Sequence, residues 1–218
     1  MIILGIESSC DETGVAIVKD GTTLLANSIA SSMEMHKIYG GVVPEVAARS
    51  HIEAIIPTVQ NALDQFAKTY PNVSREQIWD HIDGIAVTYG PGLSGSLLIG
   101  VLTARTLAIT KNKPLYAINH VEAHVYANFL TEPLPQFPLL ALIVSGGHTQ
   151  LVLFKNHFDY ILLGQTYDDA IGEAFDKVAK ILGLPYPGGP KVEEYAKNGN
   201  PLAYPLPIAK VDGDYNFS

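Results

Sequence analysis

The sequence predicts an α/β fold made of two lobes, the second of them incomplete. Three observations support this prediction. Short apolar runs alternate with helical patterns along residues 1–130, in an order that fits one mixed sheet with helices packed on it. The segment 131–138, TEPLPQFP, then places three prolines within eight residues and cannot continue a helix. After this segment the strand pattern of the first residues starts again.

The first lobe is expected to span residues 1–130. Apolar runs bounded by turn residues predict strands at 2–6, 14–19, 22–30, 85–87 and 115–118. Helical spacing predicts helices at 44–66, at 97–109 and from about residue 119. Pro44 suits the first turn of the long helix, whereas Pro57 inside it predicts a kink or a break. The resulting order of elements is typical of a ribonuclease-H-like lobe.

The second lobe, residues 131–218, repeats the beginning of the first. We expect strands at 139–144, 149–154 and 160–163, a helix at 168–182 and a short helix at 191–196. A shift of about 137 residues lays 6–13 over 143–150, which indicates an internal duplication. The remaining strands and helices of a complete lobe have no residues here, so we interpret the chain as a truncated form, a fragment or the product of a split gene.

Composition limits the classes of protein that remain. The net charge of -8 argues against a protein that holds nucleic acid by its overall field, so such a partner would need a local basic patch or a helper subunit. The single cysteine excludes an internal disulfide and fits a reducing compartment. The first residues lack a basic leader, and the longest purely apolar run, 139–144, is too short to span a bilayer. We therefore expect a cytoplasmic protein with no membrane partner.

The segment INHVEAH places His120 and His124 four residues apart, directly after a predicted strand. If a helix begins near Asn119, the two imidazoles lie one turn apart on one face and could share a metal ion. In the protease pattern H-E-x-x-H the glutamate follows the first histidine, but here that position is Val121. Glu122 is about 200° around the helix from His120. The pattern therefore allows a two-histidine metal site or two structural histidines, and it lacks the base of a metalloprotease.

Two lobes that each present a polar hairpin turn suggest a nucleotide bound in the cleft between them. In the first turn, residues 8–14, Asp11 and Glu12 could hold a metal or accept a proton. In the second turn, residues 145–149, glycines would let the backbone approach an anion, and successive N–H groups could form a nest. Either turn could instead be an ordinary hairpin.

The predicted helices of the second lobe carry a weaker indication of nucleotide binding. Glu173 and Asp176 are three residues apart and share a helix face, where they could accept hydrogen bonds from ribose hydroxyls or simply be solvated. Gly188 and Gly189 precede the short helix and would allow a base or a sugar to lie against its start.

The segment GPGLSG at 90–95 formally matches the dinucleotide pattern G-x-G-x-x-G. Its context differs, because it follows three strands and a helix, and Asn119 stands where an acidic residue is needed. We favour close packing or a partner surface over cofactor binding. In the helix that follows, Gly100 and Ala104 lie one turn apart and permit close helix contact.

Six motifs taken together are much more specific than any one of them. They are GIESSCDET, YGGVVPEVAARSH, GPGLSGSL, INHVEAH, VSGGHTQL and DDAIGEAFDKVAKILGLPYPGGP. In this combination the chain resembles the tRNA N6-adenosine threonylcarbamoyltransferase (TsaD) family, whose members were once labelled O-sialoglycoprotein endopeptidases. The resemblance implies an actin/hexokinase/Hsp70-like fold of two ribonuclease-H-like lobes. It also implies transfer of a threonylcarbamoyl group from threonylcarbamoyl-AMP to the exocyclic amine of the adenosine 3' of the anticodon in tRNA.

The resemblance also implies roles for residues. His120 and His124 match the metal-binding histidines of the family, and Asp11 and Glu12 match acidic residues near the reacting group. The positions that match the substrate and nucleotide site are Ile143, Val144, Ser145, Gly146, Gly147, Asp176 and Gly189. The implied cofactor is one divalent metal, with iron favoured and zinc possible. The third metal ligand of the family, an aspartate, falls beyond residue 218, so we expect these residues alone to be inactive and to bind metal weakly.

The implied partners are tRNA, threonylcarbamoyl-AMP or an adenine nucleotide, and two protein subunits of a bacterial-type complex. One subunit is a non-catalytic paralogue that pairs through the helix after the GPG loop, and the other is an ATPase. Under this hypothesis, charged substitutions at Gly100 or Ala104 abolish pairing. The alternatives are a non-catalytic scaffold paralogue of the same fold and an ATP-dependent kinase of small molecules.

Overall fold

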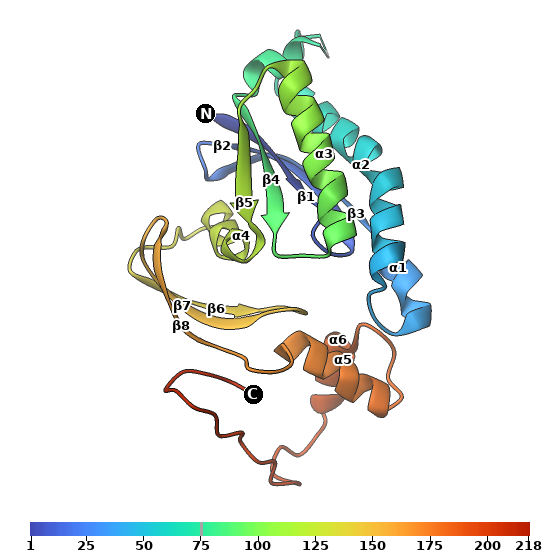
Figure 1. Cartoon of the computed structure of the whole chain (residues 1–218), viewed down its shortest axis with the longest axis vertical. Coiled ribbons are helices and arrows are strands. Elements are labelled where there is room, and N and C mark those ends of the chain that lie inside the picture. Colours follow the sequence, from blue (N-terminus) through green and yellow to red (C-terminus); the bar gives the residue numbers. More distant parts are fainter. Residues whose placement is uncertain (75) are drawn as a thin grey trace. The chain divides into compact units, whose positions relative to one another are not determined.

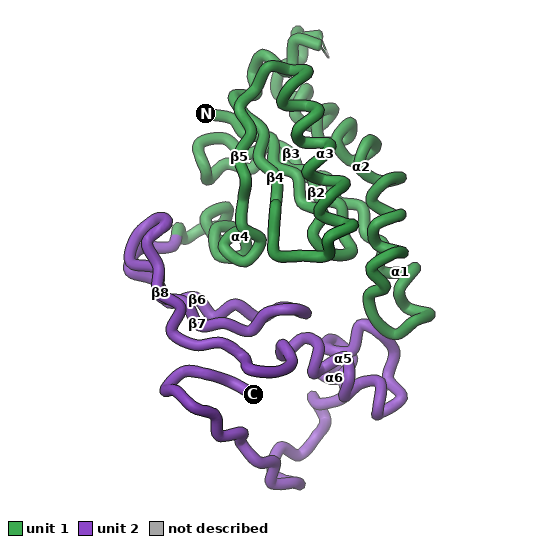
Figure 2. The backbone as a smooth tube through the Cα atoms, viewed as in Figure 1, with its two compact units in different colours: residues 1–134 green, residues 135–218 purple. Residues whose placement is uncertain are grey.

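The computed structural model describes residues 1–74 and 76–218. The chain divides into two compact units, Met1–Leu134 and Pro135–Ser218 (Figures 1 and 2). The division lies inside the proline-rich segment 131–138.

The first unit is built on a five-stranded sheet in the order β3-β2-β1-β4-β5. Its strands are β1 (Ile2–Glu7), β2 (Glu12–Lys19), β3 (Thr23–Ser31), β4 (Gly84–Gly90) and β5 (Leu115–Asn119). The first three strands form an antiparallel meander, and β4 and β5 join the other side of β1 in parallel. This topology is that of a ribonuclease-H-like lobe and confirms the fold class predicted from the order of elements.

Two long helices cover this sheet. The helices of the unit are α1 (Met33–His36), α2 (Pro44–Ala67), α3 (Ser94–Lys111) and α4 (His120–Tyr126), with the 3-10 turns η1 (Lys37–Tyr39), η2 (Gln77–His81) and η3 (Ala127–Leu130). In Figure 1, α2 and α3 lie side by side, and α2 contacts β2 and β3 while α3 contacts β4 and β1. Between the helices and the sheet lies an apolar core whose members include the fully buried Leu4, Ile17, Phe66 and Ile85.

The long helix α2 continues through Pro57, so of the kink or break predicted there the break is wrong. A proline removes the hydrogen bond to the carbonyl four residues earlier, here that of Glu53. Pro57 and Glu53 both lie on the exposed side of α2. Water can therefore bind the freed carbonyl, while buried Ile55, Val59 and Phe66 hold the other side of α2 in the core.

The small residues of α3 face the interior of the unit. A Cβ atom added at Gly100 would collide with the hydroxyl of Ser8, and Ala104 is fully buried in the core. The interpretation of these two positions as a partner surface is therefore wrong, because their small size serves the packing of α3 on β1. The opposite side of α3 exposes Leu98, Leu102 and Ile109.

The GPG loop is also a site of close packing. A Cβ atom at Gly92 would lie 2.7 Å from both the Cβ atom and the carbonyl oxygen of Ser9. The amide of Leu93 donates a hydrogen bond of 2.8 Å to the same carbonyl. Glycine is therefore needed to bring this loop against the β1–β2 turn, which agrees with the packing interpretation of the motif.

The second unit begins with a three-stranded antiparallel sheet in the order β6-β7-β8. Its elements are β6 (Leu139–Val144), β7 (Thr149–Asn156), β8 (Asp159–Gln165), α5 (Ile171–Ile181) and α6 (Gly188–Ala196). Adding 137 to the bounds of β1 and β2, 2–7 and 12–19, gives 139–144 and 149–156, the bounds of β6 and β7. The duplication indicated by the sequence is therefore present in the strands themselves.

The two hairpins differ in the register of their pairing, although the strand bounds leave four residues in each connection, 8–11 and 145–148. Glu7 pairs with Gly14 in the first unit, whereas Val144 pairs with Thr149 in the second. The turn between paired residues therefore holds residues 8–13 in the first hairpin and residues 145–148 in the second, a difference of two. Since side chains alternate along a strand, a difference of two residues leaves the same faces of the hairpin turned inward. The longer turn of the first unit includes Cys10 and Asp11.

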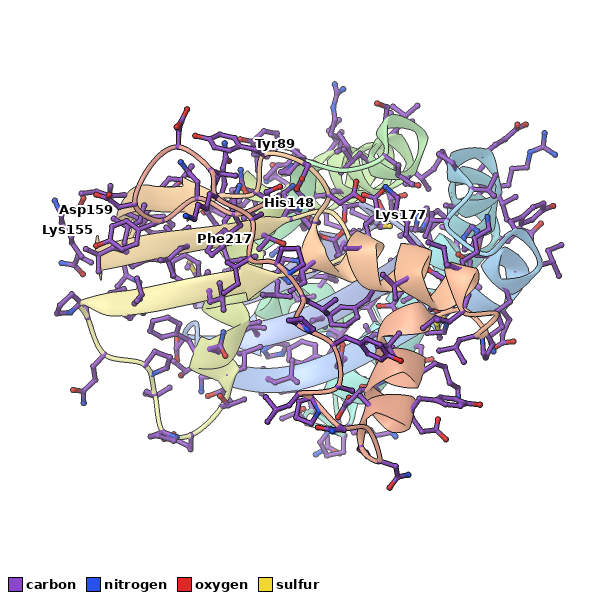
Figure 3. The ribbon with its side chains drawn as sticks, turned by 90° about the horizontal axis from the view of Figure 1, so that it is seen from below. Tyr89, His148, Lys155, Asp159, Lys177 and Phe217 are labelled. Carbon is purple, nitrogen blue, oxygen red and sulfur yellow. The ribbon has the colours of Figure 1, made fainter. Side chains whose placement is uncertain are left out.

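The last residues of the second unit return to β8. The amide of Phe217 donates to the carbonyl of Gln165, and the amide of Tyr167 donates to the carbonyl of Phe217, each at 3.0 Å. Phe217 is labelled in Figure 3. A Cβ atom at Gly164 would collide with the carbonyl of Tyr215, so this segment can pass only because residue 164 is glycine. The sequence analysis did not predict this contact.

Replacing Phe66 with alanine should strongly destabilise the first unit. Phe66 is fully buried, so its removal leaves a cavity, and we expect the free energy of unfolding to fall by ~3–5 kcal/mol. Urea unfolding can be followed by the fluorescence of Trp79, the only tryptophan, which lies in the same core. Ile52→Ala, at an exposed position of the same helix, is the control and should cost much less. Equal losses in the two variants would contradict the assignment of the core.

Candidate functional site

The histidine pair lies at the start of α4. The side chain of Asn119 accepts hydrogen bonds from the amides of Val121 and Glu122, at 2.9 and 3.2 Å, and so caps the helix. The helix therefore begins at His120, as the motif predicted, and His124 follows one turn later. The Nε2 atoms of the two imidazoles lie 3.2 Å apart.

This separation suits two ligands of one metal ion. Two nitrogens that each lie ~2.0–2.1 Å from a metal at a tetrahedral angle are ~3.3 Å apart. The Nε2 atoms of His120 and His124 already approach this spacing. Within residues 1–74 and 76–218, no third histidine, cysteine, aspartate or glutamate joins them to form a group of three metal-ligating side chains. The described residues thus offer two ligands.

The carboxylate of Glu7, at the end of β1, lies next to the Nδ1 atom of His120. Its Oε2 atom is 3.3 Å from the Nδ1 atom of His120 and accepts a hydrogen bond of 2.5 Å from the hydroxyl of Thr88. Its Oε1 atom accepts from the amide of Ser9, whose hydroxyl lies 3.1 Å from the same Nδ1. Burial raises the pKa of Glu7, but the hydrogen bonds from His120, Ser9 and Thr88 outweigh it and bring the pKa down to about 2. Glu7 is therefore an ionised acceptor.

The backbone of the turn next to Glu7 is held from several sides. The carbonyl of Ser9 is bound by the amide of Leu93, as described above. The carbonyl of Cys10 accepts hydrogen bonds from the Nε2 of His51 on α2, at 3.0 Å, and from the hydroxyl of Ser96 on α3, at 3.2 Å. Both helices therefore fix the position of this carbonyl.

The next carbonyl, that of Asp11, is bound from α1. Both the amide and the hydroxyl of Ser32 donate to it, at 3.0 and 2.7 Å. His36 supports Ser32, because its Nδ1 accepts from the amide of Val43 at 3.2 Å and its Nε2 lies 3.1 Å from the Ser32 hydroxyl. Since Nδ1 is the acceptor, the proton of a neutral His36 must be on Nε2, which donates to Ser32.

A second buried histidine has the same tautomer. The Nε2 of His51 donates to the carbonyl of Cys10, so the Nδ1 of the neutral ring accepts from the hydroxyl of Thr13 at 2.7 Å. His36 and His51 are 0% and 1% exposed, respectively, so water cannot replace these hydrogen bonds. Their sequence neighbours gave no indication of this role.

The acidic residues of the turn follow this fixed backbone. Asp11 is half-buried, and Glu12 is exposed as the first residue of β2. Cys10 is exposed at the surface, but partial burial of its thiol, with the charges of Asp11 and Glu7, raises the pKa of Cys10 to about 12. A thiol with this pKa stays protonated near neutral pH and is a poor nucleophile.

In the second unit, the turn after β6 is held by hydrogen bonds among its own residues. The hydroxyl of Ser145 accepts hydrogen bonds from the amides of Gly147 and His148, at 3.3 and 3.0 Å. The amide of Ser145 donates to the carbonyl of His148 at 2.9 Å. The amides of Gly147 and His148, which the sequence suggested for an anion nest, therefore bind Ser145. Before the turn, Ile143 is buried in the sheet and Val144 is exposed.

Helix α5 starts against this turn. The amide of Ile171 donates to the hydroxyl of Thr149 at 2.9 Å, and the amide of Gly172 donates to the carbonyl of Ser145 at 3.2 Å. A Cβ atom at Gly172 would lie 2.6 Å from that carbonyl oxygen, so a larger residue would push the helix away. The sequence analysis did not identify Gly172 as important for the site.

Asp176 connects α5 to α6. Its Oδ1 atom accepts a hydrogen bond of 2.7 Å from the amide of Gly188, the first residue of α6, and thereby brings Gly189 near. Glu173 has a different partner, because its carboxylate lies 3.1 Å from the Nζ of Lys177, labelled in Figure 3. Glu173 and Asp176 therefore contact different groups.

Comparison with known proteins identifies the family. The sequence pattern of the family described as TsaD: tRNA N6-adenosine threonylcarbamoyltransferase matches residues 23–218. Proteins called tRNA N6-adenosine threonylcarbamoyltransferase from Symbiobacterium thermophilum and Thermomicrobium roseum are 52% and 53% identical to the chain over its whole length. The chain belongs to the TsaD family.

The TsaD relatives are longer than this chain. It spans 61% of the Symbiobacterium thermophilum protein and 59% of the Thermomicrobium roseum protein. Among solved structures, YeaZ from Pseudomonas aeruginosa is 17% identical with a TM-score of 0.42, over 74% of this chain and 65% of that one. Component A of the Acidaminococcus fermentans (R)-2-hydroxyglutaryl-CoA dehydratase is 14% identical with a TM-score of 0.49, over 92% and 60% of the two chains.

Family membership confirms the resemblance inferred from the six motifs. Eight of the 687 matching curated proteins, 47–53% identical to the chain, all carry the name tRNA N6-adenosine threonylcarbamoyltransferase. In the part of this TsaD chain that the structure describes, no helix is both long enough and apolar enough to cross a membrane.

Cys10 should react slowly with alkylating reagents while the first unit is folded. Because its pKa is raised to about 12, its thiolate is scarce at pH 8, and we expect iodoacetamide to react at least ~10-fold more slowly than with the urea-unfolded chain. Asp11→Asn removes a charge that raises this pKa and should speed the reaction, whereas Asp80→Asn at an exposed position should not. Mass spectrometry reports Cys10 alone, since it is the only cysteine. Equal rates in the folded and unfolded chains would contradict this account.

Proposed function

We propose that this chain carries the residues for transferring a threonylcarbamoyl group from threonylcarbamoyl-AMP to the exocyclic amine of the adenosine 3' of the anticodon in tRNA. The observation that supports this most directly is 52% identity over the whole chain to a protein named for the transferase. The histidine pair and the acidic turn beside it agree with that chemistry. The rival functions, a scaffold subunit and a small-molecule kinase, do not require a metal-binding histidine pair.

In this proposal, His120 and His124 hold one divalent metal ion through their Nε2 atoms. Their separation of 3.2 Å supports this assignment. Imidazole pairs suit iron and zinc, and the family resemblance favours iron. When bound, the metal would act as a Lewis acid toward carbamoyl or phosphate oxygens.

The acidic turn of the first unit is proposed to accept the proton of the attacking amine. Asp11 and Glu12 follow carbonyls that three helices and the GPG loop hold in place, so their main chain is fixed before substrate binds. A carboxylate at hydrogen-bond distance from the amine can take its proton as the new N–C bond forms. The adenylate of a mixed anhydride leaves easily, so positioning of the two substrates is the larger contribution.

The second unit is proposed to bind the nucleotide part of threonylcarbamoyl-AMP. The residues are those that match the family, Ile143, Val144, Ser145, Gly146, Gly147, Asp176 and Gly189. Asp176 uses Oδ1 to hold the amide of Gly188, and its Oδ2 would accept a hydrogen bond from a ribose hydroxyl. Gly146 and Gly147 are exposed and offer a surface without side chains to a flat or charged group.

The proposed protein partners are a non-catalytic paralogue and an ATPase subunit, and the proposed macromolecular substrate is tRNA. The net charge of -8 favours a tRNA surface that these subunits share. For the paralogue we propose the exposed apolar side of α3, which carries Leu98, Leu102 and Ile109. The neighbouring helix α2 exposes Ile52 and Ile56 as well.

A chimaeric enzyme tests the proposed transfer. Residues 1–218 would replace the corresponding part of the Symbiobacterium thermophilum relative, and digested tRNA would be analysed for threonylcarbamoyladenosine by mass spectrometry. We expect the chimaera to form the modified nucleoside, and Asp11→Asn or His120→Ala to reduce its formation by ~10²-fold or more. His157→Ala, in a β7–β8 connection, is the control and should be active.

The same assay applied to residues 1–218 alone should show no transfer, according to the hypothesis stated from the sequence. Robust transfer by these residues alone would contradict that hypothesis. A folded chimaera that makes no modified nucleoside, or that instead moves phosphate from ATP to a small acceptor, would overturn the proposed function.

A charge on the exposed side of α3 should prevent pairing with the paralogue. Leu102 is 48% exposed, so Leu102→Asp should leave the fold intact but bury a carboxylate in the proposed interface. We expect the heterodimer to be lost in light scattering of the mixed subunits. Thr22→Asp, which adds the same charge at an exposed position outside α2 and α3, is the control and should pair normally. An unchanged heterodimer of the Leu102→Asp variant would exclude this surface.

A further inference from the structure

The side chain of Glu7 connects the centre of the sheet to the histidine pair. It projects from the end of β1, which lies between β2 and β4 in the five-stranded sheet. Each of its oxygens has its own donor, the amide of Ser9 for Oε1 and the hydroxyl of Thr88 for Oε2. The carboxylate is therefore fixed in position before any ligand binds.

Both oxygens of Glu7 already act as acceptors, toward the amide of Ser9 and the hydroxyl of Thr88, so a ring nitrogen that faces this carboxylate is favoured as a donor. The Nδ1 of His120 lies 3.3 Å from Oε2 of Glu7, and a lone pair at that nitrogen would face a negative oxygen. A proton on Nδ1 removes this repulsion. Because a neutral imidazole carries only one proton, Nε2 of His120 then has a lone pair, and it lies 3.2 Å from Nε2 of His124.

We propose that Glu7 is a positioning residue that holds His120 in the Nδ1–H tautomer and so directs its Nε2 lone pair toward a metal ion shared with His124. The metal part of this inference rests on the proposed function, whereas the tautomer does not. A carboxylate behind a ligating histidine fixes the ring and raises the basicity of the ligating nitrogen. The helix that carries both histidines has only seven residues, so an anchor on the central sheet supplies orientation that so short a helix lacks.

The variant Glu7→Gln removes the negative charge of the side chain and keeps its size and shape. Glutamine keeps a carbonyl oxygen that can accept from Ser9 or Thr88, but its amide can donate to Nδ1 of His120 and favour the Nε2–H tautomer. Glu45→Gln, at an exposed position paired with Arg49, is the matched control. Unfolding in urea, followed by Trp79, establishes that both variants are folded.

Nitrogen-15 NMR of the histidine side chains in the metal-free chain gives the decisive measurement. We expect His120 of the unchanged chain and of Glu45→Gln to be protonated at Nδ1, and Glu7→Gln to lose this preference. An Nε2–H tautomer in the unchanged chain would overturn the proposal, even if Glu7→Gln failed to fold. An unchanged tautomer in folded Glu7→Gln would overturn it as well.

Titration with Zn²⁺ then tests the effect of Glu7 on metal binding separately from its effect on the tautomer of His120. Loss of a carboxylate behind a ligating histidine typically weakens metal binding by ~10–100-fold, and we expect this loss in Glu7→Gln but not in Glu45→Gln. Equal Zn²⁺ affinity in Glu7→Gln and the unchanged chain would overturn the proposed effect of Glu7 on the metal. If His120 has the expected tautomer but no form of the chain binds Zn²⁺, the metal site of the proposed function fails while the role of Glu7 in setting the tautomer stands.

Discussion

The first unit depends on the fixed backbone of the β1–β2 turn. Three successive carbonyls, those of residues 9–11, accept hydrogen bonds from the GPG loop, from α2 and α3, and from α1. A turn of this length on its own would be mobile, because fixing each residue costs ~1–2 kcal/mol of conformational entropy. Here the helices that bind the turn are already ordered by their packing in the core, and their hydrogen bonds offset this entropy loss. The main-chain positions of Asp11 and Glu12 follow from these hydrogen bonds, whereas the side chain of Glu7, just before the turn, is held by Ser9 and Thr88.

Three histidines of the first unit perform different tasks because their hydrogen-bond partners differ. His36 and His51 are buried, and both hold backbone groups. In the neutral ring of each, Nδ1 is the acceptor and Nε2 is the donor. His120 faces a carboxylate at Nδ1 and another imidazole at Nε2. Because an acceptor faces Nδ1 of His120, its proton is on Nδ1, the opposite tautomer to that of His36 and His51. Nε2 of His120 therefore keeps its lone pair. The difference lies in the second partner of each ring, which sequence spacing does not reveal.

The sequence predicted the elements well because its signals for them are local. Apolar runs and turn residues located the strands within a few residues, and the 137-residue shift indicated the duplication that the strand bounds repeat. It also predicted that His120 and His124 share a face. It failed where the outcome depends on distant contacts. The break at Pro57 is absent because that side of α2 is exposed, and Gly100 and Ala104 face β1 rather than a partner. Glu7 escaped notice because His120 is 113 positions away.

The turns of the two duplicated hairpins have different hydrogen-bond partners. With residues 8–13 between paired strand ends, the first turn is long enough to present side chains while neighbouring elements bind its carbonyls. In the second turn, residues 145–148, Ser145 instead binds the turn's own amides. What the second turn gains is close contact with α5, since Gly172 allows the helix to start against Ser145. The two-residue difference in strand pairing therefore accompanies two different sets of hydrogen bonds. Neighbouring elements bind the carbonyls of the first turn, whereas the second turn binds its own amides and the start of α5.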